Sequence, residues 1–169
     1  EGFQQGLCTV IHGVRIQCRK STPILLHMPA PQRFRHAAIV GKPQAQGTRE
    51  LIEDVARFLA QQGLDVSLES ATAKATGITA YDVLDAAQLG QRCDVTVVVG
   101  GDGTMLGIAR ELAQFDMPLV GINQGRLGFI TDIPVDRFRE ALTPMVRGEF
   151  EEEHRAMLDA SVWRGDECI

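Results

Sequence analysis

An apolar strand turns directly into a helix-forming segment at Val97-Val98-Val99-Gly100-Gly101-Asp102-Gly103-Thr104-Met105-Leu106. Glycine has no β-carbon and reaches backbone conformations with positive φ, so these three glycines let a ligand lie directly on the main chain. The helix that follows directs its unpaired N-terminal amides and the positive end of its dipole toward the same place. The stretch therefore predicts a phosphate-binding loop at the end of a buried strand.

Asp102 is the candidate catalytic residue of this loop. A carboxylate next to a phosphate repels it, so we expect this one to hold Mg²⁺ or to accept a proton from an attacking hydroxyl. The alternative is a purely structural turn, because glycine-rich loops follow many buried strands.

The composition excludes several classes of protein. A chain of 169 residues with 44% hydrophobic residues is long enough for one globular domain with a sizeable core, plus some remainder. The net charge of -5, without a local cluster of Lys and Arg, argues against nucleic acid as a partner. No apolar run approaches the roughly 20 residues of a membrane span, and the first residues lack the order of a signal peptide. We expect a cytoplasmic protein with no membrane partner.

Cysteine and histidine spacings give no sign of a disulfide framework or a metal site. No Cys-x-x-Cys pair occurs, and no histidines stand at His-Glu-x-x-His or similar spacing. We therefore expect free thiols and no structural metal. The residues concerned are Cys8, Cys18, Cys93, Cys168, His12, His27, His36 and His154.

The hydrophobic pattern from His36 onward alternates between strands and helices. We predict strands over 37–40, 64–69, 95–99 and 118–123, and helices over 51–62, 81–89, 104–115 and 135–146. This order is typical of a parallel, Rossmann-like α/β sheet with right-handed crossovers. Ligands bind such sheets at the carboxyl ends of the strands, where Gly41, Gly100 and Asn123 fall.

The chain divides into three predicted parts. Residues 1–35 are an N-terminal extension, either non-native sequence upstream of a natural start at Met28 or a genuine short arm or edge strand. Residues 36–150 are the α/β phosphate-loop domain, and residues 151–169 contain the first strand of a truncated β-rich domain.

The last part begins with an acidic run over 149–153, which we interpret as a solvated linker. A strand is predicted over 157–163, followed by a hairpin turn over 164–167. Because one strand has no ladder partner and two are marginal, we expect the natural protein to continue into a second, β-rich domain.

A second glycine-rich stretch follows the next strand, at Gly121-Ile122-Asn123-Gln124-Gly125-Arg126-Leu127-Gly128-Phe129-Ile130-Thr131-Asp132. Two such loops on adjacent strands make a cleft. Asp102 lies in the first of these loops and would therefore face this cleft. The alternative is a conformationally demanding loop in which Phe129 is simply buried.

The two stretches together resemble the NAD kinase family, which has a Gly-Gly-Asp-Gly-Thr loop and then Gly-Ile-Asn-x-Gly-x-Leu-Gly-Phe-x-Thr-Asp at about this separation. Diacylglycerol, sphingosine and 6-phosphofructokinase-type kinases of the same superfamily share the first element alone. The resemblance covers about His36 to Trp163, and the second stretch looks most like the bacterial branch. It implies the N-terminal α/β domain of that superfamily.

The resemblance also implies a reaction. In this family the γ-phosphate of ATP, carried with Mg²⁺, or of polyphosphate in some members, passes to the 2′-hydroxyl of the adenosine ribose of NAD, which gives NADP. Asp102 resembles the proton acceptor for that hydroxyl, Leu106 and Phe129 resemble the apolar wall of the adenosine site, and Asn123 resembles a polar residue that shapes the pocket. The implied nucleotide-binding residues are Gly100, Gly101, Asp102, Gly103, Thr104, Leu106, Asn123 and Phe129.

Further dinucleotide contacts belong to the family's second domain, which would begin where this chain ends. The resemblance therefore implies that this chain alone is weakly active or inactive, and that the full-length protein is a homo-oligomer. Two other functions stay open: a lipid or sugar kinase of the same superfamily, and a non-catalytic nucleotide-binding module that kept the loop.

Overall fold

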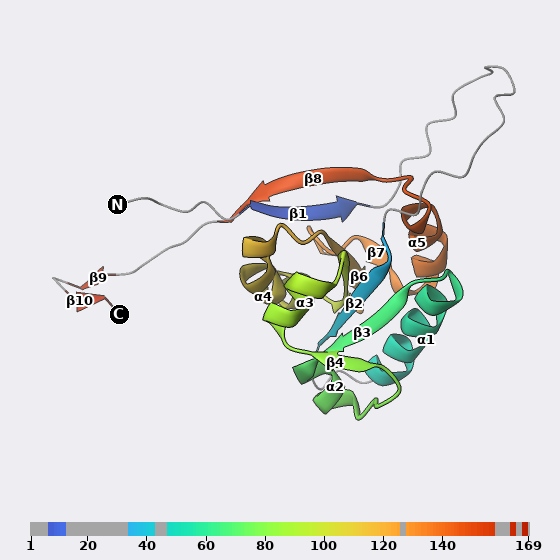
Figure 1. The fold of residues 1–169 in the computed structure, drawn as a ribbon. Helices are drawn as coiled ribbons and strands as arrows, with labels where there is room; N and C mark the ends of the chain where they lie inside the picture. Colours follow the sequence, from blue (N-terminus) through green and yellow to red (C-terminus); the bar gives the residue numbers. More distant parts are fainter. Residues whose placement is uncertain are drawn as a thin grey trace, which may run out of the picture.

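A computed structural model describes residues 7–12, 34–42, 47–125, 128–157, 163–164 and 167–168. One sheet runs through the molecule in the strand order β4-β3-β2-β5-β6-β1-β8, and β7 also pairs with β6. Helices pack against both faces of this sheet (Figure 1). All of its pairings are parallel except the one between β1 and β8. The predicted α/β class with a parallel sheet is confirmed.

The strands are β1 (Leu7–His12), β2 (His36–Gly41), β3 (Asp65–Glu69), β4 (Asp82–Leu84), β5 (Val95–Gly100), β6 (Leu119–Asn123), β7 (Ile133–Pro134), β8 (Glu151–Ala156), β9 (Trp163–Arg164) and β10 (Glu167–Cys168). The helices are α1 (Thr48–Gln61), α2 (Ser70–Thr76), α3 (Ala86–Arg92), α4 (Asp102–Leu112) and α5 (Phe138–Val146), with short 3-10 helices η1 (Ala113–Phe115) and η2 (Val135–Arg137).

Strand β5 lies in the middle of the sheet, between β2 and β6. All six of its residues are buried, as expected for a parallel strand covered by helices on both faces. Its β-branched side chains suit such a strand because they pack well on a pleated surface. The register fixes Val97 opposite Ile39 of β2 and Val120 of β6.

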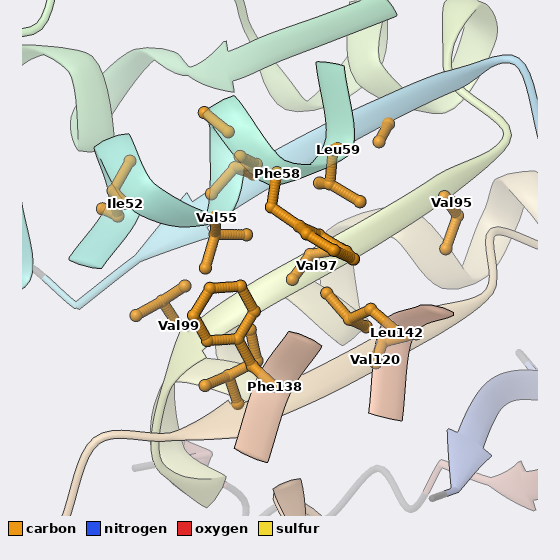
Figure 2. Packing of buried hydrophobic residues seen from close by; sticks show 14 of the residues in the cluster. Ile52, Val55, Phe58, Leu59, Val95, Val97, Val99, Val120, Phe138 and Leu142 are labelled. Carbon is orange, nitrogen blue, oxygen red and sulfur yellow. The ribbon is translucent and has the colours of Figure 1, made fainter. Parts of the chain in front are cut away.

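The first hydrophobic core lies between the sheet and helices α1 and α5. Figure 2 shows Phe58 of α1 and Phe138 of α5 beside Val97 and Val99 of β5. The two rings meet edge to face, with centroids 5.8 Å apart and planes at 88°, an arrangement favoured by the aromatic quadrupole. Leu142 of α5 is fully buried in the same cluster.

The second core lies on the opposite face, under α3 and α4. Met105 and Leu112 of α4 and Leu89 of α3 are almost completely buried there with Val98 of β5. Because α4 begins immediately after β5 and the glycine turn, this packing fixes where the helix starts. The phosphate-loop candidate is therefore held between a buried strand and a buried helix face.

The predicted helix over 81–89 is wrong in its first half. Residues 82–84 form β4, which pairs in parallel with β3, and the helix begins only at Ala86. Asp85 caps this helix: its Oδ1 accepts from the backbone N–H of Gln88 at 2.8 Å, and its own N–H donates to Gln88 Oε1 at 3.0 Å. This capping box fixes the start of the helix and leaves the preceding residues extended.

The acidic run is not a linker throughout. Residues 151–156 form β8, which pairs antiparallel with β1. Residues 151–154 are exposed. A strand at the edge of a sheet can carry such charged side chains, because its pairing depends on backbone hydrogen bonds while the side chains stay in solvent. Strand β1 places part of the predicted extension 1–35 in the sheet; the origin of that extension stays a prediction.

The predicted strand over 157–163 lies mostly outside the described residues. Strands β9 and β10 pair with Arg164 opposite Glu167, which agrees with the predicted hairpin turn; its two middle residues are not described. Continuation into a β-rich domain stays a prediction. In the described part of the chain, no helix has the length and apolarity needed to cross a bilayer.

Candidate active site

The two glycine-rich loops leave adjacent strands at the same edge of the sheet. Gly100 ends β5 directly opposite Asn123, which ends β6. The backbone N–H of Gln124 donates to the carbonyl of Gly100 at 2.9 Å, so the two chains stay paired as the loops begin. The strand ends thus bring the loops together, as the sequence predicted.

The first loop leads straight into α4. Gly101 is the N-cap residue and has no side chain to satisfy the first amides, while its carbonyl accepts from the N–H groups of Thr104 and Met105. The helix N-terminus therefore presents free donor groups and the positive end of its dipole at the sheet edge. These are the groups that bind phosphates at helix N-termini.

The glycines of this loop serve two different purposes, and none of them has a positive φ. A β-carbon on Gly100 would lie 2.6 Å from Oγ1 of Thr104, so glycine is required there by packing. A β-carbon on Gly101 or Gly103 would meet nothing within 4 Å. The main chain at these two positions is therefore open to a ligand. Glycine is useful there because it has no β-carbon, and not because it reaches an unusual backbone conformation.

The Asp102 carboxylate binds the second loop through four hydrogen bonds. Oδ2 accepts from the backbone N–H of Phe129 at 2.8 Å. Oδ1 accepts from the N–H of Ile130 at 3.2 Å and from both the N–H and the hydroxyl of Thr131, at 3.0 and 2.9 Å. One side chain of the first loop thus organises three consecutive residues of the second.

These contacts favour the charged form of the Asp102 carboxylate. Partial burial raises the pKa of the carboxyl, but the hydrogen bonds from Phe129, Thr131 and Ile130 outweigh it and hold the pKa below its ordinary value. Hydrogen bonds to the charged form favour that form. The carboxylate is therefore ionised throughout the neutral pH range.

Gly128 is a glycine because the carboxylate approaches its backbone too closely for any side chain. A β-carbon on Gly128 would overlap the carboxyl oxygens and carbon of Asp102. This glycine was not among the predicted site residues. Gly128 belongs to the second glycine-rich stretch. The need for glycine there follows only from the position of Asp102, 26 residues earlier in the sequence.

Asn123 and Thr131 are two buried polar residues that bind each other next to the Asp102 carboxylate. Asn123 Nδ2 donates to the carbonyl of Thr131 at 3.1 Å and to its hydroxyl at 2.9 Å. Thr131 is completely buried, and Asn123 is 5% exposed. The predicted polar pocket residue Asn123 therefore holds the second loop, and Thr131, which was not among the predicted site residues, connects it to Asp102.

Phe129 is 94% exposed, so the alternative in which its ring is buried is wrong. Leu106 is also exposed, at 39%, and lies one helical turn after Asp102 on the same face of α4. Both predicted wall residues are thus apolar and accessible. The backbone of Phe129 binds the Asp102 carboxylate, and Leu106 follows Asp102 on the same helix.

The adjoining strand end is tightly closed. The backbone N–H of Gly41 donates to Oγ1 of Thr72, whose hydroxyl in turn donates to Glu69 Oε2 at 2.8 Å. Thr48 of α1 donates to Gln124 Oε1 at 2.8 Å, which ties α1 to the residue after β6. These contacts fix the end of β2 beside the two loops.

The described residues contain no group of three or more His, Cys, Asp or Glu side chains that could hold a metal ion. A divalent ion at this edge would be ligated mainly by phosphate oxygens and water, as Mg²⁺ prefers.

Burial raises the pKa of the Cys93 thiol to about 11, and this cysteine is free. The side chains of Cys8, Cys18 and Cys168 lie outside the described part.

Comparisons with known proteins agree with this geometry. The family of the ATP-NAD kinase N-terminal domain matches residues 37–150. The chain is 61% identical over 137 residues to the NAD kinase of Methylibium petroleiphilum, covering 80% of this chain and 46% of that protein. It is 58% identical over 137 residues to the NAD kinase of Polaromonas naphthalenivorans, covering 81% and 47%. The chain spans about half the length of these curated relatives.

Among solved structures, the fold is similar to the crystal structure of yeast NADH kinase complexed with NADH. The TM-score is 0.57 at 16% sequence identity, over 70% of this chain and 38% of that one. At this identity the likeness concerns the fold alone, and it agrees with the parallel α/β sheet described above.

Proposed function

Because the chain belongs to the NAD kinase family, we propose that it carries the phosphate loop and the proton acceptor of an ATP-dependent NAD kinase. The reaction transfers the γ-phosphate of ATP to the 2′-hydroxyl of the adenosine ribose of NAD and gives NADP. The observation that supports this most is the place of Asp102, an ionised carboxylate between an open glycine backbone and an exposed aromatic ring.

In the proposed step, the 2′-oxygen of NAD forms a bond to the γ-phosphorus of Mg-ATP while the bond from that phosphorus to its bridging oxygen breaks. The proton of the hydroxyl passes to the Asp102 carboxylate, and ADP leaves with the bridging oxygen. Phosphoryl transfer has a loose transition state, so the acceptor takes the proton late and a weakly basic aspartate suffices. Mg²⁺ enters as part of the nucleotide substrate.

The phosphates would lie against the open main chain at Gly101 and Gly103 and the N-terminus of α4. Gly100 and Thr104 shape the same loop from beneath, because they pack against each other. Backbone amides and a helix dipole by themselves favour an anion at this place. ATP is the proposed donor, with inorganic polyphosphate as the alternative.

The adenosine part of NAD would contact the exposed side chains of Phe129 and Leu106. An exposed phenyl ring offers a flat apolar face on which a base can stack. The backbone N–H of the same phenylalanine binds Asp102, so a stacked adenosine would bring its ribose near the carboxylate. Asn123 contributes by holding the second loop in place.

A non-catalytic nucleotide-binding module is the second candidate, and one observation favours it. Four hydrogen bonds already engage the Asp102 carboxylate, which is what a purely structural aspartate would show. The second glycine-rich stretch argues against a lipid or sugar kinase of the same superfamily. A panel of acceptor substrates distinguishes such a kinase from an NAD kinase.

The test is NADP formation from NAD and Mg-ATP by the complete gene product, with Asp102→Asn beside Asp82→Asn. Asp82 is a matched control because its carboxylate is exposed and, among the described residues, its ion pair is the 3.9 Å contact with Arg92. Loss of a general base costs about 10²- to 10⁴-fold in rate, so we expect that loss at Asp102 and none at Asp82. Equal rates in the two variants would contradict the role of Asp102 as proton acceptor, and a parent protein that forms no NADP would leave the binding module.

The remaining expectations form part of the same proposal. We expect the complete protein to be a cytoplasmic homo-oligomer, and the 169-residue chain by itself to be weakly active or inactive. Size measurement in solution and a comparison of NADP formation by the two polypeptides test these points. Rapid NADP formation by the 169-residue chain would contradict the second.

A further inference from the structure

The two oxygens of the Asp102 carboxylate are used unequally. Oδ1 accepts three hydrogen bonds, two of them from Thr131 and one from Ile130. Within the described part of the chain, Oδ2 accepts one, from the backbone N–H of Phe129. Since each carboxylate oxygen has about two strong acceptor directions, Oδ1 is saturated and Oδ2 keeps acceptor capacity.

The direction of the hydrogen bonds through Thr131 is fixed by chemistry. The amide nitrogen of Asn123 can only donate, so the Thr131 hydroxyl accepts from it at 2.9 Å. That hydroxyl has a single proton, which it donates to Oδ1 of Asp102 at 2.9 Å. Both Thr131 and Asn123 are buried, so water does not replace either partner.

The rotamer of Thr131 is also fixed, by packing. Its methyl carbon Cγ2 occupies the space beside Gly121, where a β-carbon would lie only 2.7 Å from it and 2.9 Å from Cε of Met105. A β-branched side chain whose methyl group is confined has one position left for its hydroxyl. The absence of a side chain at Gly121 therefore aims the hydroxyl at Asp102.

We propose that Thr131, held by Asn123, is a positioning residue that engages Oδ1 of Asp102 and leaves Oδ2 as the atom that receives the proton of the attacking hydroxyl. This inference rests on the proposed kinase function and deepens it. In the phosphoryl transfer step, the proton of the substrate hydroxyl moves to Oδ2 as its oxygen bonds to the γ-phosphorus and ADP departs. Thr131 touches neither substrate and acts only through the carboxylate.

The test compares Thr131→Val with Thr131→Ser in the complete gene product. Valine keeps the shape and the methyl group but loses the hydroxyl, whereas serine keeps the hydroxyl and loses the methyl group. Because a hydrogen bond to a charged group is lost, we expect valine to lower kcat by about 10- to 100-fold with little change in KM for NAD. Serine should lose clearly less activity than valine, because its hydroxyl keeps both hydrogen-bond partners although the methyl group that confines the rotamer is gone.

A double variant separates positioning from mere support of the fold. If Thr131 acts through Asp102, then Thr131→Val has no further effect on kcat in a protein that already carries Asp102→Asn. Thermal unfolding of each variant shows whether it is folded at the assay temperature. Multiplied losses in the double variant, or equal losses for valine and serine, would overturn the positioning role.

A second readout does not depend on turnover. The ¹³C resonance of the Asp102 carboxyl, identified by its disappearance in Asp102→Asn, is followed against pH in the parent protein and both threonine variants. We expect a higher titration midpoint for Thr131→Val and an unchanged one for Thr131→Ser. If the parent protein forms no NADP, the proposed function fails together with the role of Oδ2 in it. An unchanged midpoint in the valine variant of an active protein would overturn the positioning role, because Thr131 would then not engage the carboxylate.

Discussion

The backbone N–H of Phe129 donates to Oδ2 of Asp102 at 2.8 Å, while the ring of the same phenylalanine is 94% exposed. One residue therefore connects an open apolar surface to the carboxylate through its own main chain. A ligand that stacks on the ring meets the carboxylate at a fixed offset. Such a fixed arrangement favours reaction because the reacting groups need not be ordered again in each turnover.

Removing the ring should affect binding and leave the fold unchanged. Phe129→Ala keeps the backbone N–H that binds Asp102 and removes only an exposed side chain. Base–aromatic stacking contributes about 1–3 kcal/mol, so we expect KM for NAD to rise roughly 5- to 150-fold. Val83→Ala is the matched control, since Val83 is an apolar side chain 48% exposed on β4. Steady-state kinetics at saturating Mg-ATP measure this, and equal KM values would contradict it.

Adding one methyl group at Gly128 should displace the carboxylate. The β-carbon of Gly128→Ala would overlap Asp102, so either the second loop or the carboxylate must move. Overpacking of this kind costs about 1–3 kcal/mol in stability, and we expect the rate of NADP formation to fall by at least about tenfold.

Gly107→Ala is the control for this change. Gly107 lies within α4, where a β-carbon would meet nothing within 4 Å. Alanine in a helix interior is favoured over glycine by roughly 0.5–1 kcal/mol, so this variant should be slightly more stable. Urea unfolding of both variants checks the pair; similar stability changes in the two would show that the Gly128 contact is unimportant.

The stabilising effect of the Asp102 carboxylate should disappear in acid. Its folded-state pKa lies below the ordinary value because hydrogen bonds from Phe129, Thr131 and Ile130 outweigh burial. A lowered pKa means that the carboxylate adds stability above the pKa of the unfolded chain, and that this contribution is lost as the pH falls through the folded-state pKa.

Urea unfolding of the parent protein and Asp102→Asn over a pH series measures this. The parent protein should be the more stable of the two at pH 7, and the difference should shrink once the pH falls below the ordinary aspartate range. A difference that does not change with pH would show that the charge of Asp102 contributes nothing to the loop.

Thr96 offers a way to stabilise the sheet. Its side chain is fully buried on β5, and its hydroxyl has no hydrogen-bond partner among the described residues. Valine has nearly the same shape without the polar group, and an unsatisfied buried polar group costs about 1–3 kcal/mol. We expect Thr96→Val to be more stable by about 1–2 kcal/mol in urea unfolding.

Thr72→Val is the contrasting variant, because the Thr72 hydroxyl accepts from the Gly41 N–H and donates to Glu69. Removing it leaves a buried amide without its acceptor, so this variant should be destabilised. Stabilisation of both threonine variants, or of neither, would contradict the assignment of an unsatisfied hydroxyl to Thr96.

The sheet centre and the first loop could be predicted because their signals are local. A run of β-branched residues over 95–99 followed by three glycines gives a buried strand and an open turn without reference to the rest of the chain. Asp85 and Gln88 also stand at the spacing of a capping box, a local signal for the helix start that the prediction over 81–89 did not use.

The pairing of β1 with β8 could not be predicted, because it joins segments from opposite ends of the chain and the charged residues of β8 do not alternate with apolar ones. Likewise, Asp102 was recognised as a candidate acceptor, but its hold on residues 129–131 depends on how a distant loop folds back. Thr131 looked like one polar loop residue among several until that fold was known.

The parallel pairing of β1 with β6 sets an order of events during protein synthesis. Val10 lies opposite Leu119, about 110 positions later in the chain. At ribosomal rates of about 5–20 residues per second, the first strand waits roughly 5 to 20 s before its partner is made. During that time it is an unpaired segment available to chaperones, so the rate of elongation between residues 10 and 119 governs how long the nascent chain is exposed to misassembly.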